Sequence, residues 1–265
     1  MCATCGCGHD DVRVSTLGHD DEHAGGHVHP HEHQHPHDHP HEAAETLVLE
    51  ERVFAKNDAL AEHNRAYLTA QQITTLNLMS SPGSGKTSLL ERTIADLRTT
   101  LEIGVIEGDQ ETLLDAERIR SAGARAVQIN TGAGCHLDAD MLYRGLETLN
   151  PSSGSLVFVE NVGNLVCPAL FDLGEARKVV VISVTEGDDK PLKYPHMFAA
   201  ADLVIVNKTD LLPYVDFDLD RCTSAARSLN PGMQTIALSV RSGDNIDAWY
   251  GWLRATMKER VRERM

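Results

Sequence analysis

The sequence is short of aromatic residues, of basic charge and of long apolar runs, and each shortage argues against a class of protein. Aromatic side chains make up 5% of its 265 residues, so aliphatic side chains must form most of the core. Lysine and arginine number 24 against 39 acidic residues, and the charge of −15 disfavours binding to nucleic acid or to an anionic membrane. Because no apolar run reaches about 18 residues, no transmembrane helix is expected.

The N-terminus also lacks the apolar stretch of a secretory signal, so export is not expected. Six cysteines in a protein that is not exported are expected to stay reduced, which leaves their thiolates available for a metal or for catalysis. These features predict a cytoplasmic protein with one large domain or two small ones.

Three of the six cysteines stand at the start of the chain, at Cys2, Cys5 and Cys7. A redox role of the thioredoxin kind would need a strand–helix–strand setting, and the surrounding sequence does not predict one. If Met1 is removed, the amine of Cys2 adds a fourth donor to three thiolates, and a square-planar site of that kind suits Ni²⁺. Thiolates also bind Zn²⁺ well, so the ligand types alone do not exclude zinc.

A histidine-rich segment of low complexity follows at residues 9–42. All of the 14 histidines except His63, His136 and His196 lie in it. Such a segment cannot bury enough apolar surface to offset its ordering entropy, so we expect it to be disordered without metal. Alternating imidazoles predict a weak, multi-site metal store, and the alternative is a solvated leader with incidental affinity.

The rest of the chain predicts a helical segment followed by one α/β domain. Residues 43–72 show a rough helical spacing of apolar side chains, with a break expected near Asn57 and Asp58. From 73 to 265, short apolar runs alternate with helical stretches, which predicts a mainly parallel sheet flanked by helices, with ligands at the carboxyl ends of its strands. The expected strands are 74–79, 103–107, 126–130, 156–160, 179–184, 203–207 and 234–238, and the expected helices include 86–98, 113–122, 139–149 and 246–262.

The string SSPGSGKTS at 80–88 lies between an expected strand and an expected helix, which is the context of a phosphate-binding loop. Lys86 is expected to neutralise the β- and γ-phosphates, and the Thr87 hydroxyl is expected to bind Mg²⁺. The usual pattern has glycine where this chain has Ser80, and the alternative is an ordinary glycine- and serine-rich turn that caps a helix. The residues expected to surround the phosphates are Gly83, Ser84, Gly85, Lys86, Thr87 and Ser88.

The string NKTD at 207–210 predicts a guanine site. The Asp210 carboxylate can accept both N1–H and N2–H₂ of guanine, and adenine offers no matching pair of donors. Asn207 and Lys208 are expected to support the base, and Ser239 with Val240 lies where a third base-side loop would fall. A polar loop that closes a strand is the alternative, but the preceding phosphate loop favours GTP over ATP.

Two acidic strand ends complete the expected nucleotide pocket. Asp109 and Glu160 follow strands and are expected to bind Mg²⁺ together with Thr87, and one of them could orient the attacking water. Gly163 is expected to contact the γ-phosphate through its N–H, which would make its segment a switch. The alternative for either carboxylate is an exposed acid at a strand end.

A second set of metal ligands lies inside the domain. Cys135 and His136 share a glycine-rich loop, and Cys167 falls a few residues beyond Glu160. Thiolates and imidazole from these loops could share one metal and leave a position for a partner subunit, water or a second protein. Buried, inert cysteines are the alternative.

Longer strings around these motifs are more specific than a phosphate loop. They are MC-x-x-CGC at 1–7, SSPGSGKTSLL at 80–90, EGDQET at 107–112, TGAGCHLDADM at 131–141, ENVGNLVCPALFDLGE at 160–175, TEGDDKPLKYP at 185–195 and NKTDLLPY at 207–214. With these strings and the histidine-rich insert, the chain resembles the hydrogenase nickel-incorporation GTPases of the HypB family over nearly its whole length.

The resemblance implies a slow, Mg²⁺-dependent GTPase of the signal-recognition and nitrogenase-iron-protein class that dimerises with GTP and serves maturation of [NiFe]-hydrogenase. It implies a high-affinity nickel site at Cys2, Cys5 and Cys7. A weaker nickel or zinc site at Cys135, His136 and Cys167 would lie at the dimer interface. The implied partners are the zinc protein HypA and, indirectly, the hydrogenase large-subunit precursor. By analogy with related dimers, Lys190 or Lys193 would reach the nucleotide of the other subunit.

Two other functions compete with this one. Urease nickel-insertion GTPases share the phosphate loop but carry a Cys-Pro-His metal motif, whereas this chain has Cys135-His136 and a separate Cys167-Pro168. A nickel storage protein with a vestigial GTPase domain is the second, and the intact Lys86, Thr87 and Asp210 disfavour it.

Overall fold

The computed structural model describes residues 40–109, 114–132 and 134–262. The chain divides into two compact units, Met1–Val53 and Phe54–Met265, and helix α1 (Pro40–Ala70) begins in the first and ends in the second. The predictions for Cys2, Cys5 and Cys7 and for the histidine-rich stretch up to residue 39 lie outside the described residues.

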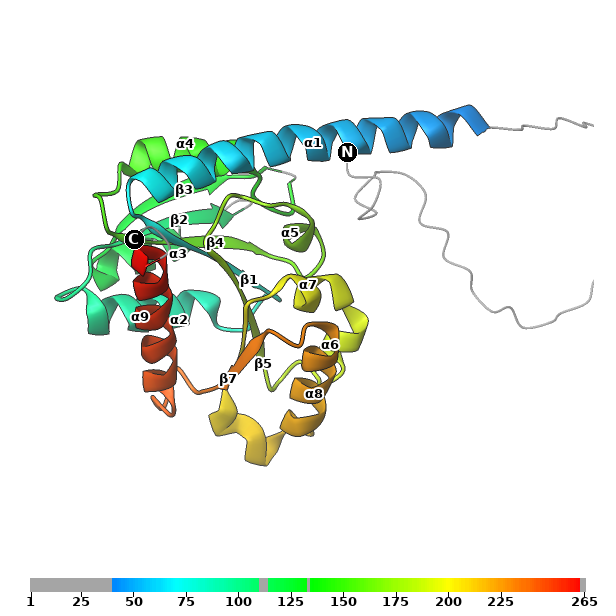
Figure 1. The fold of residues 1–265 in the computed structure, drawn as a ribbon. Helices are drawn as coiled ribbons and strands as arrows, with labels where there is room; N and C mark the ends of the chain where they lie inside the picture. The colour runs from blue at the N-terminus through cyan, green and yellow to red at the C-terminus, as the bar shows by residue number, and fades with distance from the viewer. Residues whose placement is uncertain (1–39, 110–113, 133, 263–265) are drawn as a thin grey trace, which may run out of the picture. The chain divides into compact units, whose positions relative to one another are not determined.

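Seven parallel strands form one sheet in the order β3-β2-β4-β1-β5-β6-β7 (Figure 1). The fold class predicted from the alternation of apolar runs is therefore confirmed, and each of the seven predicted strands is present. The central strands β1 and β4 are buried along most of their length, as expected for a parallel sheet covered on both faces. The strands are β1 (Thr74–Ser80), β2 (Ile103–Asp109), β3 (Arg125–Asn130), β4 (Leu156–Gly163), β5 (Arg177–Ser183), β6 (Leu203–Asn207) and β7 (Gln234–Ala237).

Helices cover both faces of the sheet. Helices α2, α3 and α9 pack on one face through an apolar cluster that includes Phe158 and Trp249. On the other face, α4 and the end of α1 cover β2 and β4, while α7 and α8 cover β5 and β6. The remaining helices are α2 (Lys86–Leu97), α3 (Leu114–Ala122), α4 (Ala139–Leu149), α5 (Cys167–Leu170), α6 (Lys190–Lys193), α7 (Pro195–Ala200), α8 (Leu219–Leu229), α9 (Ile246–Arg262) and the 3₁₀ helix η1 (Thr209–Tyr214).

Two helical features differ from the sequence-based expectations. The break expected near Asn57 and Asp58 is wrong, because α1 continues through both residues. The Asn57 side chain bonds to backbone groups of Asp172 and Ala139 rather than to its own backbone, so it does not compete with the helix. The short helices α5, α6 and α7 were not predicted, although each carries a proline in its first turn, a common helix-start signal.

None of the helices in the described part of the chain combines the length and the apolar character that a membrane span requires.

Candidate nucleotide and metal sites

The phosphate loop joins the end of β1 to the start of α2 and lines a cavity of about 570 Å³. Gly83 and Gly85 have φ angles of 74° and 97°, a left-handed conformation that side chains rarely adopt. At Gly85 a Cβ would also lie 2.4 Å from Asn207 Nδ2, so only glycine fits there. The first turn of α2 directs its backbone N–H groups toward this cavity, as phosphate binding requires.

Ser80 replaces the glycine of the usual pattern without strain. It is the last residue of β1, pairs with Val181 of β5, and does not belong to the described residues with positive φ. Its hydroxyl donates to the carbonyl oxygen of Ser81 at 2.8 Å. The conformation at this position is therefore one that serine adopts readily.

Two of the three residues expected to hold Mg²⁺ are in contact, and the third, Asp109, is the last residue of the neighbouring strand β2. Glu160 Oε1 accepts a hydrogen bond from Thr87 Oγ1 at 2.6 Å and lies 3.5 Å from Lys86 Nζ. Burial raises the pKa of Glu160, and Lys86 and Thr87 oppose that rise. Asp109 and Gly163 line the cavity beside the phosphate loop.

This donor set fits a hard divalent cation. Thr87, Asp109 and Glu160 offer oxygen atoms only, the ligands that Mg²⁺ prefers. Glu160 is 3% exposed, so the alternative of an exposed strand-end acid does not hold for it. Its Oε2 is buried without a hydrogen-bond partner among the described residues, and a water molecule bound to the ion would supply one.

Glu107 is a further candidate for the site, which the motifs in the sequence did not single out. It stands opposite Glu160 in the register of β2 and β4 and is 2% exposed. Burial raises its pKa to about 8, and the charges of Glu160 and Asp109 add to the rise. Burial therefore favours the neutral form of this carboxyl group. The signal in the sequence is a glutamate at the end of an apolar strand, two residues before Asp109.

The loops expected to recognise guanine meet the phosphate loop. Asn207 Nδ2 donates to the carbonyl oxygen of Ser84 at 2.9 Å, and Lys208 Nζ donates to that of Gly83 at 2.7 Å. Ser239 Oγ donates to Asp210 Oδ1 at 2.6 Å.

The third loop is tied in as well, because the backbone N–H of Val240 donates to Asn207 Oδ1 at 3.2 Å. A carboxylate has about four acceptor positions, so Asp210 can bind Ser239 and still accept from a base.

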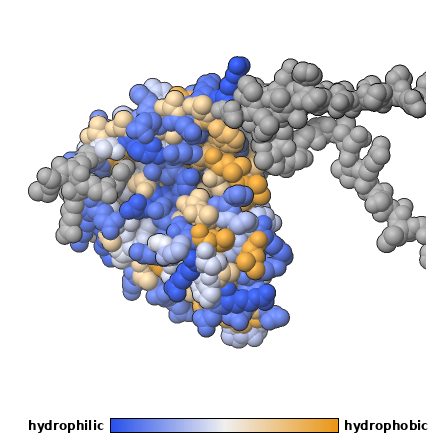
Figure 2. Space-filling model, turned by 45° about the vertical axis from the view of Figure 1, so that its right-hand side comes forward, coloured by the Kyte–Doolittle hydropathy of each residue, from blue (hydrophilic) through white to orange (hydrophobic). Residues whose placement is uncertain are grey.

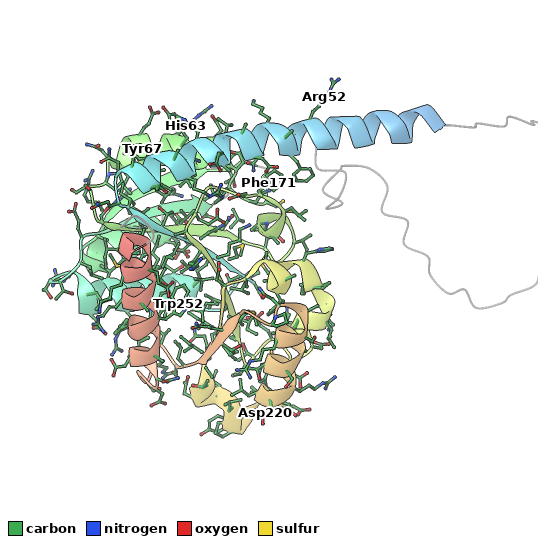
Figure 3. All side chains as sticks on the ribbon, viewed as in Figure 1. Arg52, His63, Tyr67, Phe171, Asp220 and Trp252 are labelled. Carbon is green, nitrogen blue, oxygen red and sulfur yellow. The ribbon has the colours of Figure 1, made fainter. Side chains whose placement is uncertain are left out.

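Cys135, His136 and Cys167 come together although they are distant in sequence. Their ligand atoms all lie within 4.8 Å of one another, and no other such group of three occurs among the described residues. The His136 ring stacks on Phe171, with centroids 3.9 Å apart, and Phe171 lies beneath α1 (Figure 3). Burial lowers the pKa of His136, partly offset by Asp138, and so favours the neutral imidazole that binds metals.

Helix α1 holds the two segments that carry these ligands. Asn57 accepts from the N–H of Ala139 at 3.0 Å and donates to the carbonyl oxygen of Asp172 at 2.8 Å. Asn64 Nδ2 donates to the carbonyl oxygens of Ala139 at 2.8 Å and Leu173 at 3.0 Å. The segment after His136 and the segment after Cys167 are thus fixed to one rigid helix.

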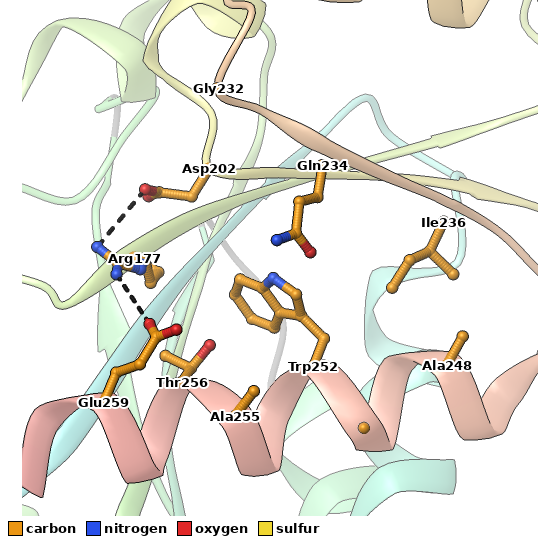
Figure 4. A pocket seen from close by; sticks show the side chains of 11 residues that line it. Arg177, Asp202, Gly232, Gln234, Ile236, Ala248, Trp252, Ala255, Thr256 and Glu259 are labelled. Carbon is orange, nitrogen blue, oxygen red and sulfur yellow. Dashed lines mark hydrogen bonds and ion pairs between the residues drawn. The ribbon is translucent and has the colours of Figure 1, made fainter.

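A second cavity, of about 600 Å³, lies at the amino ends of β5 and β7 against α9 (Figure 4). Arg177 Nη1 lies 3.8 Å from Asp202, its Nη2 lies 3.3 Å from Glu259, and Trp252 lines the same cavity. None of the predicted site residues lines it. Because ligands of parallel sheets bind at the carboxyl ends of the strands, the cavity beside the phosphate loop is the candidate nucleotide site.

Comparison with known proteins gives consistent results. Residues 74–237 match the CobW/HypB/UreG nucleotide-binding domain family. The chain is 59% identical over 213 residues to the hydrogenase maturation factor HypB of Rhizobium leguminosarum bv. viciae, covering 80% of this chain and 71% of the relative.

Two solved structures resemble the fold closely. The crystal structure of the hydrogenase maturation factor HypB from Archaeoglobus fulgidus has a TM-score of 0.72 at 41% identity, covering 77% of this chain and 99% of that one. The structure of HypB from Helicobacter pylori in complex with nickel has a TM-score of 0.72 at 38% identity, covering 77% of this chain and 96% of that one.

Proposed function

The chain belongs to the HypB family of hydrogenase maturation factors, and we propose that it is a GTP-hydrolysing nickel metallochaperone for [NiFe]-hydrogenase. One observation carries the proposal: the strand that places Glu160 at the phosphate loop leads within a few residues to Cys167, a member of the thiol–imidazole cluster. A protein that uses GTP hydrolysis to move a metal needs the nucleotide site and the metal site to be physically connected.

In this proposal the phosphate loop and the ends of β2 and β4 together perform the hydrolysis. Lys86 neutralises charge on the β- and γ-phosphates, and the N–H of Gly163 contacts the γ-phosphate. Thr87, Asp109 and Glu160 would hold Mg²⁺, which would offset the charge of the phosphate oxygens. Asp210 selects guanine over adenine. Slow turnover, which the resemblance to the HypB family implies, is part of this proposal.

Nickel is the cargo of the thiol–imidazole cluster. Two thiolates and one imidazole suit Ni²⁺ or Zn²⁺ and leave a fourth position for a ligand from elsewhere. Cys2, Cys5 and Cys7 are proposed as a tighter nickel site. The proposed partner in transfer is the zinc protein HypA, and the final acceptor is the hydrogenase large-subunit precursor.

We place the GTP-dependent dimer interface on the side of the domain that bears α5 and α6, which Figure 2 turns toward the viewer. Apolar side chains interrupt the hydrophilic surface there, and Val166 and Leu192 are 41% and 61% exposed. Lys190 and Lys193 lie on α6 and are paired with Glu186 and Asp189 within the same chain. Exchange of one of these pairs for a phosphate would let a lysine reach the partner's nucleotide.

The cluster is tested by its spectrum in the full-length protein with Cys2, Cys5 and Cys7 replaced by serine. In that background we expect Ni²⁺ to give a thiolate-to-nickel charge-transfer band from the two cysteines of the cluster. The band reports on the cluster alone, because the imidazoles of the histidine-rich segment cannot produce it. Cys167→Ala should remove most of the band and lower the Ni²⁺ affinity by at least about tenfold. Loss of a direct ligand should cost more affinity than loss of a residue that only supports a ligand, which typically costs about tenfold or more.

Cys222→Ala is the matched control for that experiment. Cys222 is also buried, but it lies on α8, in the apolar cluster that this helix forms with β5 and β6, and burial raises the pKa of its thiol to about 12. Its replacement should leave the band intact. A band that survives Cys167→Ala would refute the assignment of nickel to the cluster.

Deletion of residues 9–42 should remove several weak Ni²⁺ equivalents and keep the tightest one. Protons compete with metal for imidazole near its pKa of about 6.5, so the weak sites should empty as the pH falls toward about 5. Calorimetric titration of the full-length and deleted proteins measures this. Equal numbers of weak equivalents in the two proteins would contradict the storage role.

A further inference from the structure

The end of β4 carries two adjacent side chains that serve opposite faces of the sheet. Phe158 packs with α2 and α9, whereas Val157 and Val159 pack with α1 and α4. The alternation continues, so Glu160 points toward the phosphate loop and Asn161 toward the layer of α1 and α4. Glu160 there bonds to Thr87 and faces Lys86, as described above.

Asn161 bonds directly to the loop that carries Cys135 and His136. Its side chain is 1% exposed, and Oδ1 accepts from the backbone N–H of Leu137 at 3.0 Å and of Val162 at 3.0 Å. Leu137 immediately follows His136 in the chain. The Asn161 side chain, at the end of β4 beside the nucleotide site, therefore fixes the backbone next to His136, a proposed metal ligand.

A buried chain of hydrogen bonds extends from Asn161 to the segment after Cys167. Asn161 Nδ2 donates to Asn77 Oδ1 at 3.2 Å, and Asn77 Nδ2 donates to Glu175 Oε1 at 3.1 Å. Glu175 Oε2 then accepts from the N–H of Leu173 at 2.8 Å. In such a buried network each bond constrains its neighbours, so a displacement of Asn161 would shift both the loop after His136 and the segment after Cys167.

We propose that Asn161 is the positioning residue that couples the nucleotide site to the metal cluster. The inference rests on the proposed function, since it needs a metal at Cys135, His136 and Cys167. Glu160 and Gly163 flank Asn161 and are the strand residues expected to respond to Mg²⁺ and the γ-phosphate. A shift of this strand end moves the Leu137 amide, while Asn57 and Asn64 of α1 hold the far side of the same loop at Ala139. The spacing of the ligands, and with it the metal affinity, then depends on the nucleotide.

The test compares Ni²⁺ affinity in two nucleotide states of the full-length protein with Cys2, Cys5 and Cys7 replaced by serine, read from the charge-transfer band. Without further change we expect the affinities with a non-hydrolysable GTP analogue and with GDP to differ by about tenfold or more. Asn161→Ala should reduce that ratio to less than about twofold. A ratio that persists in a folded Asn161→Ala protein would overturn the proposal, as would equal affinities before the change.

Asn64→Ala is the matched control, because Asn64 donates from α1 to the carbonyl oxygens of Ala139 and Leu173, whereas Asn161 acts from β4. This substitution should weaken Ni²⁺ binding in both nucleotide states and leave the ratio of the two affinities unchanged. Asn230→Ala controls for the loss of a carboxamide, since Asn230 donates to two carbonyl oxygens, of Ala199 and Ala201, away from both sites. A merely structural role of Asn161 would resemble the Asn64 result.

A second measurement covers the case in which Asn161→Ala does not fold. In the protein with an intact Asn161, exchange of GDP for the GTP analogue should change the hydrogen-exchange protection of the Leu137 amide. Unchanged protection would overturn the proposal. If the protection of the Leu137 amide changes with the nucleotide but Ni²⁺ gives no charge-transfer band, the result would instead count against the proposed metal site.

Discussion

Lys86→Ala is expected to abolish measurable GTP hydrolysis, with kcat lower by at least about 10²-fold. The Lys86 side chain is 11% exposed, and its ammonium lies 3.5 Å from Glu160 Oε1, at the cavity where the phosphates would lie. Its removal leaves the developing charge on the phosphates without its main side-chain counterion in this loop. Single-turnover release of phosphate measures the effect, and nickel binding at Cys2, Cys5 and Cys7 should persist.

Lys178→Ala is a close control for this change. Lys178 is similarly covered, at 18% exposure, and its ammonium lies 3.8 Å from the buried carboxylate of Glu175, but it is not among the residues that line the phosphate cavity. Its replacement should leave the rate of hydrolysis within a few-fold of the parent. Residual hydrolysis at the parent rate in Lys86→Ala would refute the phosphate-loop assignment.

Asp210→Asn is expected to weaken GTP binding by about 100-fold, or roughly 2.7 kcal/mol, because two charge-assisted acceptor contacts with guanine are lost. The new amide N–H would oppose the N2–H₂ group of guanine but could donate to the C2 oxygen of xanthine. Xanthosine triphosphate should therefore bind the variant better than GTP does, while ATP stays weak. Competition among the three nucleotides for one fluorescent analogue measures this preference.

Asp244→Asn tests whether any lost charge near the base has the same effect. Asp244 follows the same base-side loop, but its carboxylate accepts from Ser242 Oγ at 2.7 Å and not from the groups around Asp210. It should keep the preference for GTP. An Asp210→Asn protein that still prefers GTP would show that guanine is recognised elsewhere.

The fold was predictable because its signals are local. Each of the seven strands contains a short apolar stretch between helical segments, and the central strands are buried along most of their length, as a parallel sheet covered on both faces requires. The phosphate loop was predictable for the same reason, since Gly83 and Gly85 supply backbone conformations that the loop itself requires. The short helix α5 was not predictable, because four residues are too few to show the spacing of about 3.6 residues between apolar side chains that indicates a helix.

Tertiary contacts decided what local pattern could not. Asn57 looked like a helix breaker, yet partners more than 80 residues away satisfy its amide and the helix continues. Ser80 looked like a departure from the loop, yet strand pairing gives it an ordinary conformation.

The sequence by itself determined the residue types of the site and the strands on which they lie, since these follow from spacing along one segment. Only the tertiary structure decided that Glu107 faces Glu160 and that Asn161 bonds to the loop after His136. Both contacts depend on which strands are neighbours and on which face each side chain points, and a side chain's partner across a sheet leaves no trace in its own neighbourhood of the sequence.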